Sequence, residues 1–284
     1  MSRLRAVALL LAATSVWGAT FVVVKRGLAG CAPMTFLALR FLIAAVVLLP
    51  LLRGRAVRVA RSPAVLLCGV ALFAGYSLQT WGLTGTTPAR SAFITAFSIV
   101  LVPLLEPAFG INRWSWRAVA GAGVAVAGLT VLLRPAATPL SDGDWLTAGC
   151  AVAFAFHGVL LQLAVRGETP ATVNAAQVVT TTMMAFPAAL AAGWQVTLSP
   201  TTVVALLVTG ALATVGAFWA MAEAQRALSA AETAIVLAFE PVVAGVVSVL
   251  AREDAATGSL AAGGAIVVLA VLLATVRTSR RPAS

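Results

Sequence analysis

Apolar stretches of about 20 residues recur along the whole sequence, and only short connections separate them. A helix needs about 20 residues to cross the hydrocarbon core of a bilayer, which is about 30 Å thick. Backbone groups in that core must be satisfied inside the protein, so a helix is the expected form of each span. The sequence therefore predicts an all-α integral membrane protein with ten transmembrane helices, at residues 4–24, 33–52, 64–83, 91–110, 115–133, 145–165, 171–192, 201–222, 231–250 and 258–276.

The charge content supports this interpretation. Only 10% of the residues are charged, whereas about a quarter of the residues in a soluble domain are charged. The N-terminal segment resembles a secretory signal peptide, with a basic start and an apolar core. Because similar segments follow along the whole chain, we interpret it as the first span.

The basic residues predict an orientation. With the N-terminus inside, thirteen of them lie in cytoplasmic segments and five on the opposite side, and the loop with Arg53, Arg55, Arg58 and Arg61 contributes most. An excess of Lys and Arg is typical of cytoplasmic loops. We therefore expect both termini in the cytoplasm, and the Arg-rich composition suggests a bacterial inner membrane. The net charge of +10 follows from this bias, and since no basic stripe with interleaved aromatic residues occurs, no nucleic-acid partner is expected.

Enzyme and cofactor signatures are missing from the sequence. The three cysteines are far apart, which is typical neither of a disulfide framework nor of a metal site. A single histidine cannot supply the HExxH motif of a membrane metalloprotease, and no P-loop for ATP occurs. We therefore expect no enzyme activity, no metal and no cofactor.

The two halves of the sequence align weakly but in order. Residues 17–40 align with 154–177, so that Trp17 meets Phe154 and Lys25 meets Gln162. Further along, Pro103 aligns with Pro241. This order predicts two five-helix repeats, at 1–137 and 138–284. Five is an odd number, so the second repeat would be inverted in the membrane, as in many transporters.

Several segments resemble those of a known family: VWGATFVVVKRGL (16–28), FLALRFLIAAVVLLPLL (36–52), LQTWGLTGTTPARSAFITAFSIVLVPLL (78–105) and AETAIVLAFEPVVAGVVSVLARED (231–254). In this set and order they resemble the EamA-domain exporters of the drug/metabolite transporter superfamily. The resemblance implies a ten-helix inverted repeat, export of small metabolites such as amino acids, and a central cavity. It also implies that the fifth and tenth spans lie at the periphery. The chain departs from the family pattern at Phe154, where tryptophan is common, and at Gln162, where a basic residue is common.

A carboxylate and a helix breaker stand together in the ninth span, as Glu240 and Pro241. Proline kinks a helix, and a charge at mid-membrane normally faces a cavity or a partner. We expect Glu240 to bind a substrate amine or to carry a proton; the alternative is a structural carboxylate. Pro103 and Pro241 would break corresponding helices and act as hinges. Glu106, which precedes another proline, is a second candidate for coupling or gating, or else it marks a wetted helix end.

Two further polar residues lie inside predicted spans. Arg40 in the second span either pairs with a buried glutamate and locks one state, or snorkels to the interface; contact with a substrate carboxylate is a third possibility. His157 in the sixth span is either a substrate or proton site, or a neutral, hydrogen-bonded core residue.

Aromatic and polar residues also predict a substrate pocket. Tyr76 and Gln79 are one turn apart and share a helix face. With Trp17, Thr20 and Trp219 they could bind an amphipathic metabolite, or could pack ordinarily.

The sequence therefore predicts a secondary transporter that exports a small-molecule substrate by alternating access. A proton-coupled multidrug or organic-cation exporter is the alternative, and a membrane sensor or subunit without transport is a third. Small residues in 118–130 and 259–270 suit close helix packing, either within a monomer or in a homodimer.

Overall fold

The computed structural model describes residues 1–51, 62–133, 139–253 and 256–276. Within these ranges every regular element is a helix, and the expected all-α membrane fold is confirmed. Each predicted span coincides with one helix or with consecutive helical pieces. They are α1 (Arg3–Gly27), α2 (Pro33–Leu48), α4 (Pro63–Gly85), α5 (Pro88–Thr95) with α6 (Ser98–Ala108), α7 (Trp116–Leu133), α8 (Asp142–Gly167), α9 (Pro170–Ala191), α10 (Pro200–Leu207) with η3 (Val208–Gly216) and α11 (Ala217–Ala224), α12 (Ala230–Leu237) with α13 (Glu240–Leu250), and α14 (Gly258–Val276).

Some sequence expectations fall outside the described ranges. They concern the basic loop with Arg53, Arg55, Arg58 and Arg61, the repeat boundary between 137 and 138, Arg134, and the basic tail with Arg277, Arg280 and Arg281. The division into two repeats and the cytoplasmic placement of the termini stay predictions.

Seven helical stretches in the described part of the chain are long and apolar enough to cross a membrane, and α7 and α14 contain shorter apolar helices. The remaining span, α9, is less apolar than the others. Its polar side chains face the protein interior and not the lipid. Asn174, Gln177, Thr180 and Thr181 are all buried. Threonine and amide side chains can hydrogen-bond between helices in a membrane.

Helix starts follow recognisable local signals. Ser and Thr accept hydrogen bonds from backbone N–H groups in the first turn, and proline is tolerated there because its missing N–H would have no helical partner. Helices begin with such a cap at Ser2, Thr87, Ser141, Thr169, Ser199 and Ser229.

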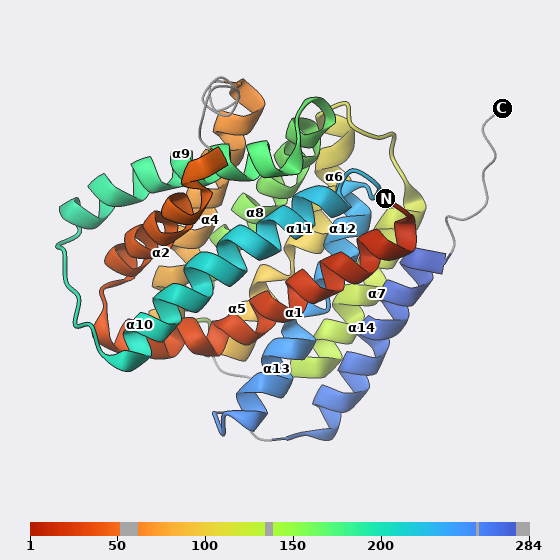
Figure 1. The fold of residues 1–284 in the computed structure, drawn as a ribbon. Coiled ribbons are helices and arrows are strands. Elements are labelled where there is room, and N and C mark those ends of the chain that lie inside the picture. Colours follow the sequence, from red (N-terminus) through yellow and green to blue (C-terminus); the bar gives the residue numbers. More distant parts are fainter. Residues whose placement is uncertain (52–61, 134–138, 254–255, 277–284) are drawn as a thin grey trace.

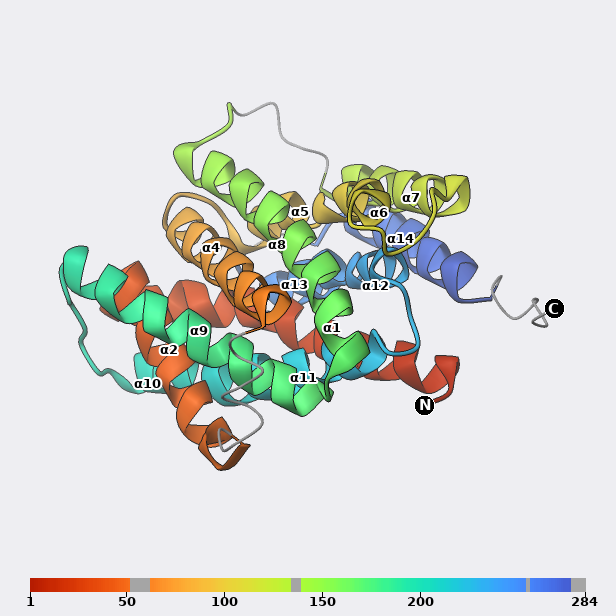
Figure 2. The same cartoon turned by 90° about the horizontal axis from the view of Figure 1, so that it is seen from above.

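The helices pack in pairs around the middle of the molecule (Figures 1 and 2). α4 packs on α8, α2 on α9, and α1 against both α11 and α13. α7 and α14 run side by side at one edge, the peripheral place expected for the fifth and tenth spans. α1 comes closest to α13 at Gly18, where an added Cβ would lie 2.6 Å from the carbonyl oxygen of Glu240. A glycine is therefore needed to bring these helices together beside the break in the ninth span.

Two spans are broken, but not at matching prolines. The breaks lie at Ala96–Phe97, between α5 and α6, and at Ala238–Phe239, between α12 and α13. Pro241 stands in the first turn of α13, whereas Pro103 lies inside α6. The expected equivalence of these two prolines is therefore wrong, because superposing the breaks aligns Ser98 with Glu240.

A third irregularity lies in the eighth span, where η3 is a nine-residue π-helix. Its wide turn is held by the Thr214 hydroxyl, which donates to the Thr209 carbonyl five residues earlier at 2.8 Å. π segments are frequent at functional sites.

Candidate functional site

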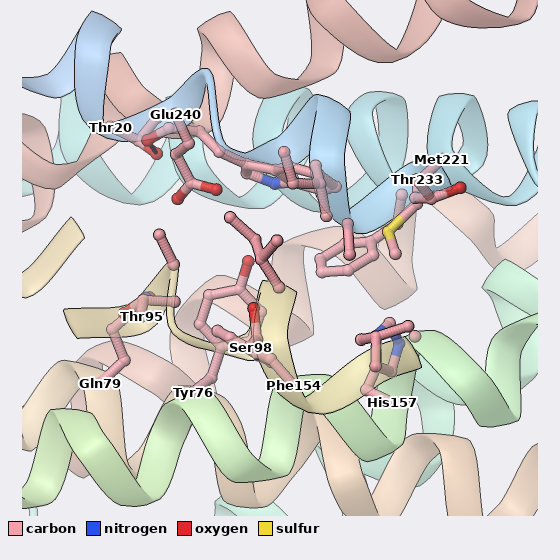
Figure 3. Close-up of a pocket in the computed structure, with 18 of the residues that line it drawn as sticks. Thr20, Tyr76, Gln79, Thr95, Ser98, Phe154, His157, Met221, Thr233 and Glu240 are labelled. Carbon is pink, nitrogen blue, oxygen red and sulfur yellow. Dashed lines mark hydrogen bonds between the residues drawn. The ribbon is translucent and has the colours of Figure 1, made fainter. Parts of the chain in front are cut away.

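A cavity lies in the middle of the molecule, between the two broken helices and helices α1, α2, α4, α8 and α11 (Figure 3). The space open to the centres of water molecules is about 80 Å³. This is room for several waters. Seven residues selected from the sequence line it together: Trp17, Thr20, Arg40, Tyr76, Gln79, His157 and Glu240.

Glu240 is the acidic residue of the cavity. It is the first residue of α13, so the break at Ala238–Phe239 turns its side chain into the cavity, toward Tyr76 and Ser98 (Figure 3). In the described part of the chain its carboxyl group makes no hydrogen bond or ion pair. A carboxyl group at a helix N-terminus is stabilised by the helix dipole. The carboxyl group of Glu240 therefore remains available to a ligand.

Arg40 supplies the opposite charge from α2. It is 3% exposed, so it does not snorkel to the interface, and the described residues offer it no carboxylate partner. Its Nε donates to the Thr214 hydroxyl at 2.9 Å, and its guanidinium lies 4.2 Å from the centre of the Tyr76 ring. The buried Nη2 has no hydrogen-bond partner in the described structure. A buried guanidinium with an unused donor favours contact with an anionic group.

Aromatic residues form much of the cavity surface. The Tyr76 ring meets Phe154 edge to face with 5.2 Å between centroids, and Phe218 at 6.0 Å. Trp17 packs on Phe218 at 4.9 Å, and its indole N–H donates to the Ala213 carbonyl of η3 at 2.8 Å. These contacts fix the rings, which present apolar surface to an amphipathic ligand.

Uncharged polar groups complete the lining. Gln79 Nε2 donates to the Thr95 hydroxyl at 3.3 Å, which joins α4 to α5 just before the first break. The Thr20 hydroxyl donates to the Trp17 carbonyl at 2.8 Å. The Thr233 hydroxyl is buried and has no partner among the described residues, so it is free to bond to a ligand or a water.

His157 connects the cavity to a buried chain of polar groups. Its Nε2 lies 3.0 Å from Gln177 Oε1, which also accepts from the Cys68 thiol at 3.2 Å. Gln177 Nε2 donates to Asn174 Oδ1 at 3.1 Å. Asn174 Nδ2 donates in turn to the Val215 carbonyl of η3 at 3.0 Å. The histidine is therefore both hydrogen-bonded in the core and part of the cavity surface.

Four sequence candidates do not line the cavity. Trp219 is 43% exposed, and its neighbour Phe218 lines the cavity instead. Glu106 is 5% exposed and accepts a hydrogen bond from the Ala231 N–H at 3.0 Å, which caps the start of α12. Pro103 and Pro241 are buried but do not line the cavity. Gating roles for Glu106, Pro103 and Pro241 stay predictions.

Sequence reasoning missed several cavity residues. Phe154 had a signal, because it aligns with Trp17 across the repeat. Ser98 would have been found by aligning the Ala-Phe dipeptides at 96–97 and 238–239. The others carried no signal, because single threonines and apolar residues are common in any span and Gln225 lies beyond the end of the predicted eighth span; they are Thr95, Phe218, Met221, Gln225 and Thr233.

The cavity can therefore hold a small molecule that carries both charges. A carboxylate and a guanidinium both line it, with aromatic rings and hydroxyls around them. In the part of the chain that the structure describes, no group of acidic, histidine and cysteine side chains could hold a metal ion.

Comparisons with known proteins agree with the fold. The sequence profile of the EamA-like transporter family matches residues 4–134 and 142–276. An uncharacterised transporter of Archaeoglobus fulgidus is 28% identical over 262 residues, which cover 92% of this chain and 83% of the relative. A protein of known crystal structure has the same fold, with a TM-score of 0.79 over 96% of this chain and 97% of that protein, at 23% identity.

Proposed function

Because this chain belongs to the EamA-like transporter family, and is thus a multi-pass membrane transporter and not an enzyme, we propose that it exports amino acids or similar small zwitterions. The observation that carries this proposal is the pair of opposite charges in the cavity, Glu240 and Arg40, each with unused hydrogen-bonding capacity. Glu240 would bind the substrate ammonium, and Arg40 Nη2 would bind the carboxylate.

The transport step we propose is alternating access. The substrate enters the cavity from the cytoplasm, and the two halves rock until the cavity opens to the other side. The breaks at Ala96–Phe97 and Ala238–Phe239 are the natural hinges, because the α-helical hydrogen bonds give way there to tighter i→i+3 bonds, from the Phe97 N–H to the Ile94 carbonyl and from the Phe239 N–H to the Val236 carbonyl. This moves the proposed hinge in the first half from Pro103 to the break that precedes it.

A second candidate is proton-coupled export of organic cations. Glu240 would then bind the cation or a proton in turn, and the rings of Trp17, Tyr76 and Phe154 would surround the cation. The unused donor of Arg40 favours the zwitterion, because a bound cation would leave a buried guanidinium beside another positive charge.

The test is counterflow exchange in proteoliposomes, with labelled amino acids, organic cations and organic anions. We expect wild type to exchange at least one amino acid. Since a hydrogen bond to a charged group contributes about 1.5–3 kcal/mol, Glu240→Gln and Arg40→Gln should each weaken its affinity roughly 10–100-fold. Ser98→Ala, at the corresponding position of the first break, is the comparison variant; it removes at most a hydrogen bond between neutral groups, so it should weaken affinity less than either charge substitution.

Other results would point elsewhere. Exchange of organic cations alone, lost in Glu240→Gln and retained in Arg40→Gln, would establish the second candidate. Amino-acid exchange that survives both substitutions would show that these charges do not bind the substrate. We further propose a bacterial inner membrane location with both termini cytoplasmic, which protease digestion of terminally tagged protein in inside-out vesicles would test.

A further inference from the structure

The chain of polar groups behind His157 has only one consistent direction. It ends at the backbone carbonyl of Val215, which can only accept a hydrogen bond. Asn174 must therefore point its amide nitrogen at Val215, at 3.0 Å, and its oxygen at Gln177. Gln177 must then donate through Nε2, at 3.1 Å, which leaves its Oε1 as the atom that faces the histidine.

This order determines where the imidazole carries its proton. Gln177 Oε1 can only accept, so His157 Nε2, at 3.0 Å, must be the donor. The Cys68 thiol donates to the same oxygen at 3.2 Å, which agrees with the assignment. If both amides were reversed, the oxygen of Asn174 would face the oxygen of Val215, and two buried acceptors would lack donors.

We propose that Asn174 and Gln177 are positioning residues, which hold the proton of the neutral His157 ring on Nε2 and leave Nδ1 as a hydrogen-bond acceptor for the substrate. His157 lines the cavity, whereas Gln177 is fully buried behind it. The described residues give Nδ1 no hydrogen-bond partner. Phe218 and Phe154 pack against the imidazole with 5.5 and 6.5 Å between ring centroids, which restricts its rotation.

The inference also narrows the substrate class, and in this respect it rests on the proposed function. If Glu240 and Arg40 bind the two charges of a zwitterion, His157 lies elsewhere on the cavity surface and meets its side chain. A lone acceptor in an aromatic pocket selects a side chain that carries an N–H or O–H donor, because the acceptor would otherwise be left without a partner.

The position of the proton can be measured directly. His157 is the only histidine, so protein labelled with ¹⁵N-histidine gives ring-nitrogen signals from this residue alone. In the neutral ring we expect Nε2 protonated and Nδ1 unprotonated, with at least about a tenfold excess over the other tautomer. Gln177→Met removes the acceptor and should produce a mixture of tautomers. The matched control is Cys68→Ala, which removes the second donor to the same oxygen and should leave the tautomer unchanged.

Either of two results would overturn the positioning role: a wild-type ring with its proton on Nδ1, or a Gln177→Met variant with an unaltered tautomer. The wild-type spectrum decides the first point even if the variant does not fold. Titration with an exchanged amino acid that carries a side-chain donor should shift the Nδ1 signal, and an alanine titration should not. An unshifted Nδ1 signal with every exchanged substrate would overturn the acceptor role. Failure of all amino acids to exchange would overturn the proposed function and leave the tautomer result intact.

Discussion

The first broken helix (residues 88–108) and the second broken helix (residues 230–250) share a plan and differ in chemistry. Each consists of an eight-residue piece, an Ala-Phe break and an eleven-residue piece. Directly after the break, the first has Ser98 and the second has Glu240. Only the second has a proline in the next position. The geometry of a broken helix therefore does not require proline, and the chain places its central carboxylate on one side of the cavity only.

The contacts at the start of the two broken helices differ in the same way. Lys25 Nζ donates to the Thr86 carbonyl, just before the first broken helix, at 3.0 Å. Gln162 Nε2 donates to the Leu228 carbonyl, just before the second, at 3.4 Å, and its Oε1 accepts from the Ala230 N–H at 2.9 Å. By the family resemblance, a basic residue is common at the position of Gln162. This chain has a charged side chain at the start of the first broken helix and a neutral amide at the start of the second.

The third residue of each broken helix makes an ion pair, with the signs exchanged. Arg90 pairs with Asp144 at 2.8 Å, and Glu232 pairs with Arg3 at 2.7 Å. Both pairs connect a broken helix to the first turn of α8 or α1. Since a negative charge is favoured at a helix N-terminus and a positive one is not, the second start is the better stabilised of the two.

We expect the largest difference in the free energy of unfolding between Gln162→Leu and its counterpart Lys25→Met. Gln162 is 7% exposed, so water cannot replace its bonds, and the Ala230 N–H would be left without an acceptor. We expect a loss of about 1–3 kcal/mol in the free energy of unfolding, measured in detergent. Lys25 is partly exposed, and water can replace its bonds; its loss should be less than half as large. Equal losses would show that Lys25 and Gln162 stabilise the starts of the two broken helices equally, although one is charged and the other is neutral.

The ion pairs should differ by a smaller amount. The Arg3–Glu232 pair is partly exposed on both sides, with side chains 27% and 24% exposed, so Arg3→Ala should cost less than about 1 kcal/mol. The Asp144 side chain is only 2% exposed, and Arg90→Ala leaves it with the Thr86 hydroxyl and the backbone of Ser141. We expect a larger cost for Arg90→Ala, about 1–2 kcal/mol, because a buried charge loses its ionic partner. Thermal unfolding of both variants at two salt concentrations checks this; a larger cost for Arg3→Ala would contradict it.

We expect the smallest changes in stability from alanine substitutions of the two prolines, and the direction of the change should differ between them. Pro241 is in the first turn of α13, where its fixed backbone angle suits the structure, so Pro241→Ala should lower stability by about 0.4–1 kcal/mol. Pro103 lies inside α6, where proline removes a helical hydrogen bond, so Pro103→Ala should not lower stability. The comparison is made by thermal unfolding of the two variants side by side. If Pro103→Ala lowered the stability and Pro241→Ala did not, Pro103 and not Pro241 would be the proline that determines the shape of its helix.

Much of the fold could be predicted because each span is a long apolar run with clear ends. The predicted ninth span, for example, begins one residue after the first residue of α12 and ends at Leu250, the last residue of α13. The break in the second broken helix also had a signal: Pro241 has no N–H, and its ring clashes with the carbonyl of Leu237. The break at Ala96–Phe97 had none, since neither residue disfavours a helix strongly. The nearest proline, Pro103, therefore indicated the wrong place.

The site was predictable where a residue type is rare in a membrane. Glu240, Arg40 and His157 are polar groups inside apolar spans, and all three line the cavity. What Arg40 contacts was not predictable, because its partner Thr214 lies 174 positions away on η3. The aromatic residue of the eighth span that faces the cavity was not predictable either: Phe218 lines the cavity, and Trp219 is exposed. A π-helix has more residues per turn than an α-helix, so it changes the face that each following residue presents.

The π-helix gives this protein a place where chain length can change without interrupting a span. A deletion of one residue within 208–216 could be absorbed if the segment rewound as an α-helix. A π turn holds one more residue than an α turn, so this deletion would remove the extra residue and leave the face of each following residue unchanged. Phe218 and Met221 would then keep their places at the cavity surface. The same deletion in a regular α-helix would rotate everything that follows by about 100°, the angle between neighbouring residues, and would turn both side chains away from the cavity.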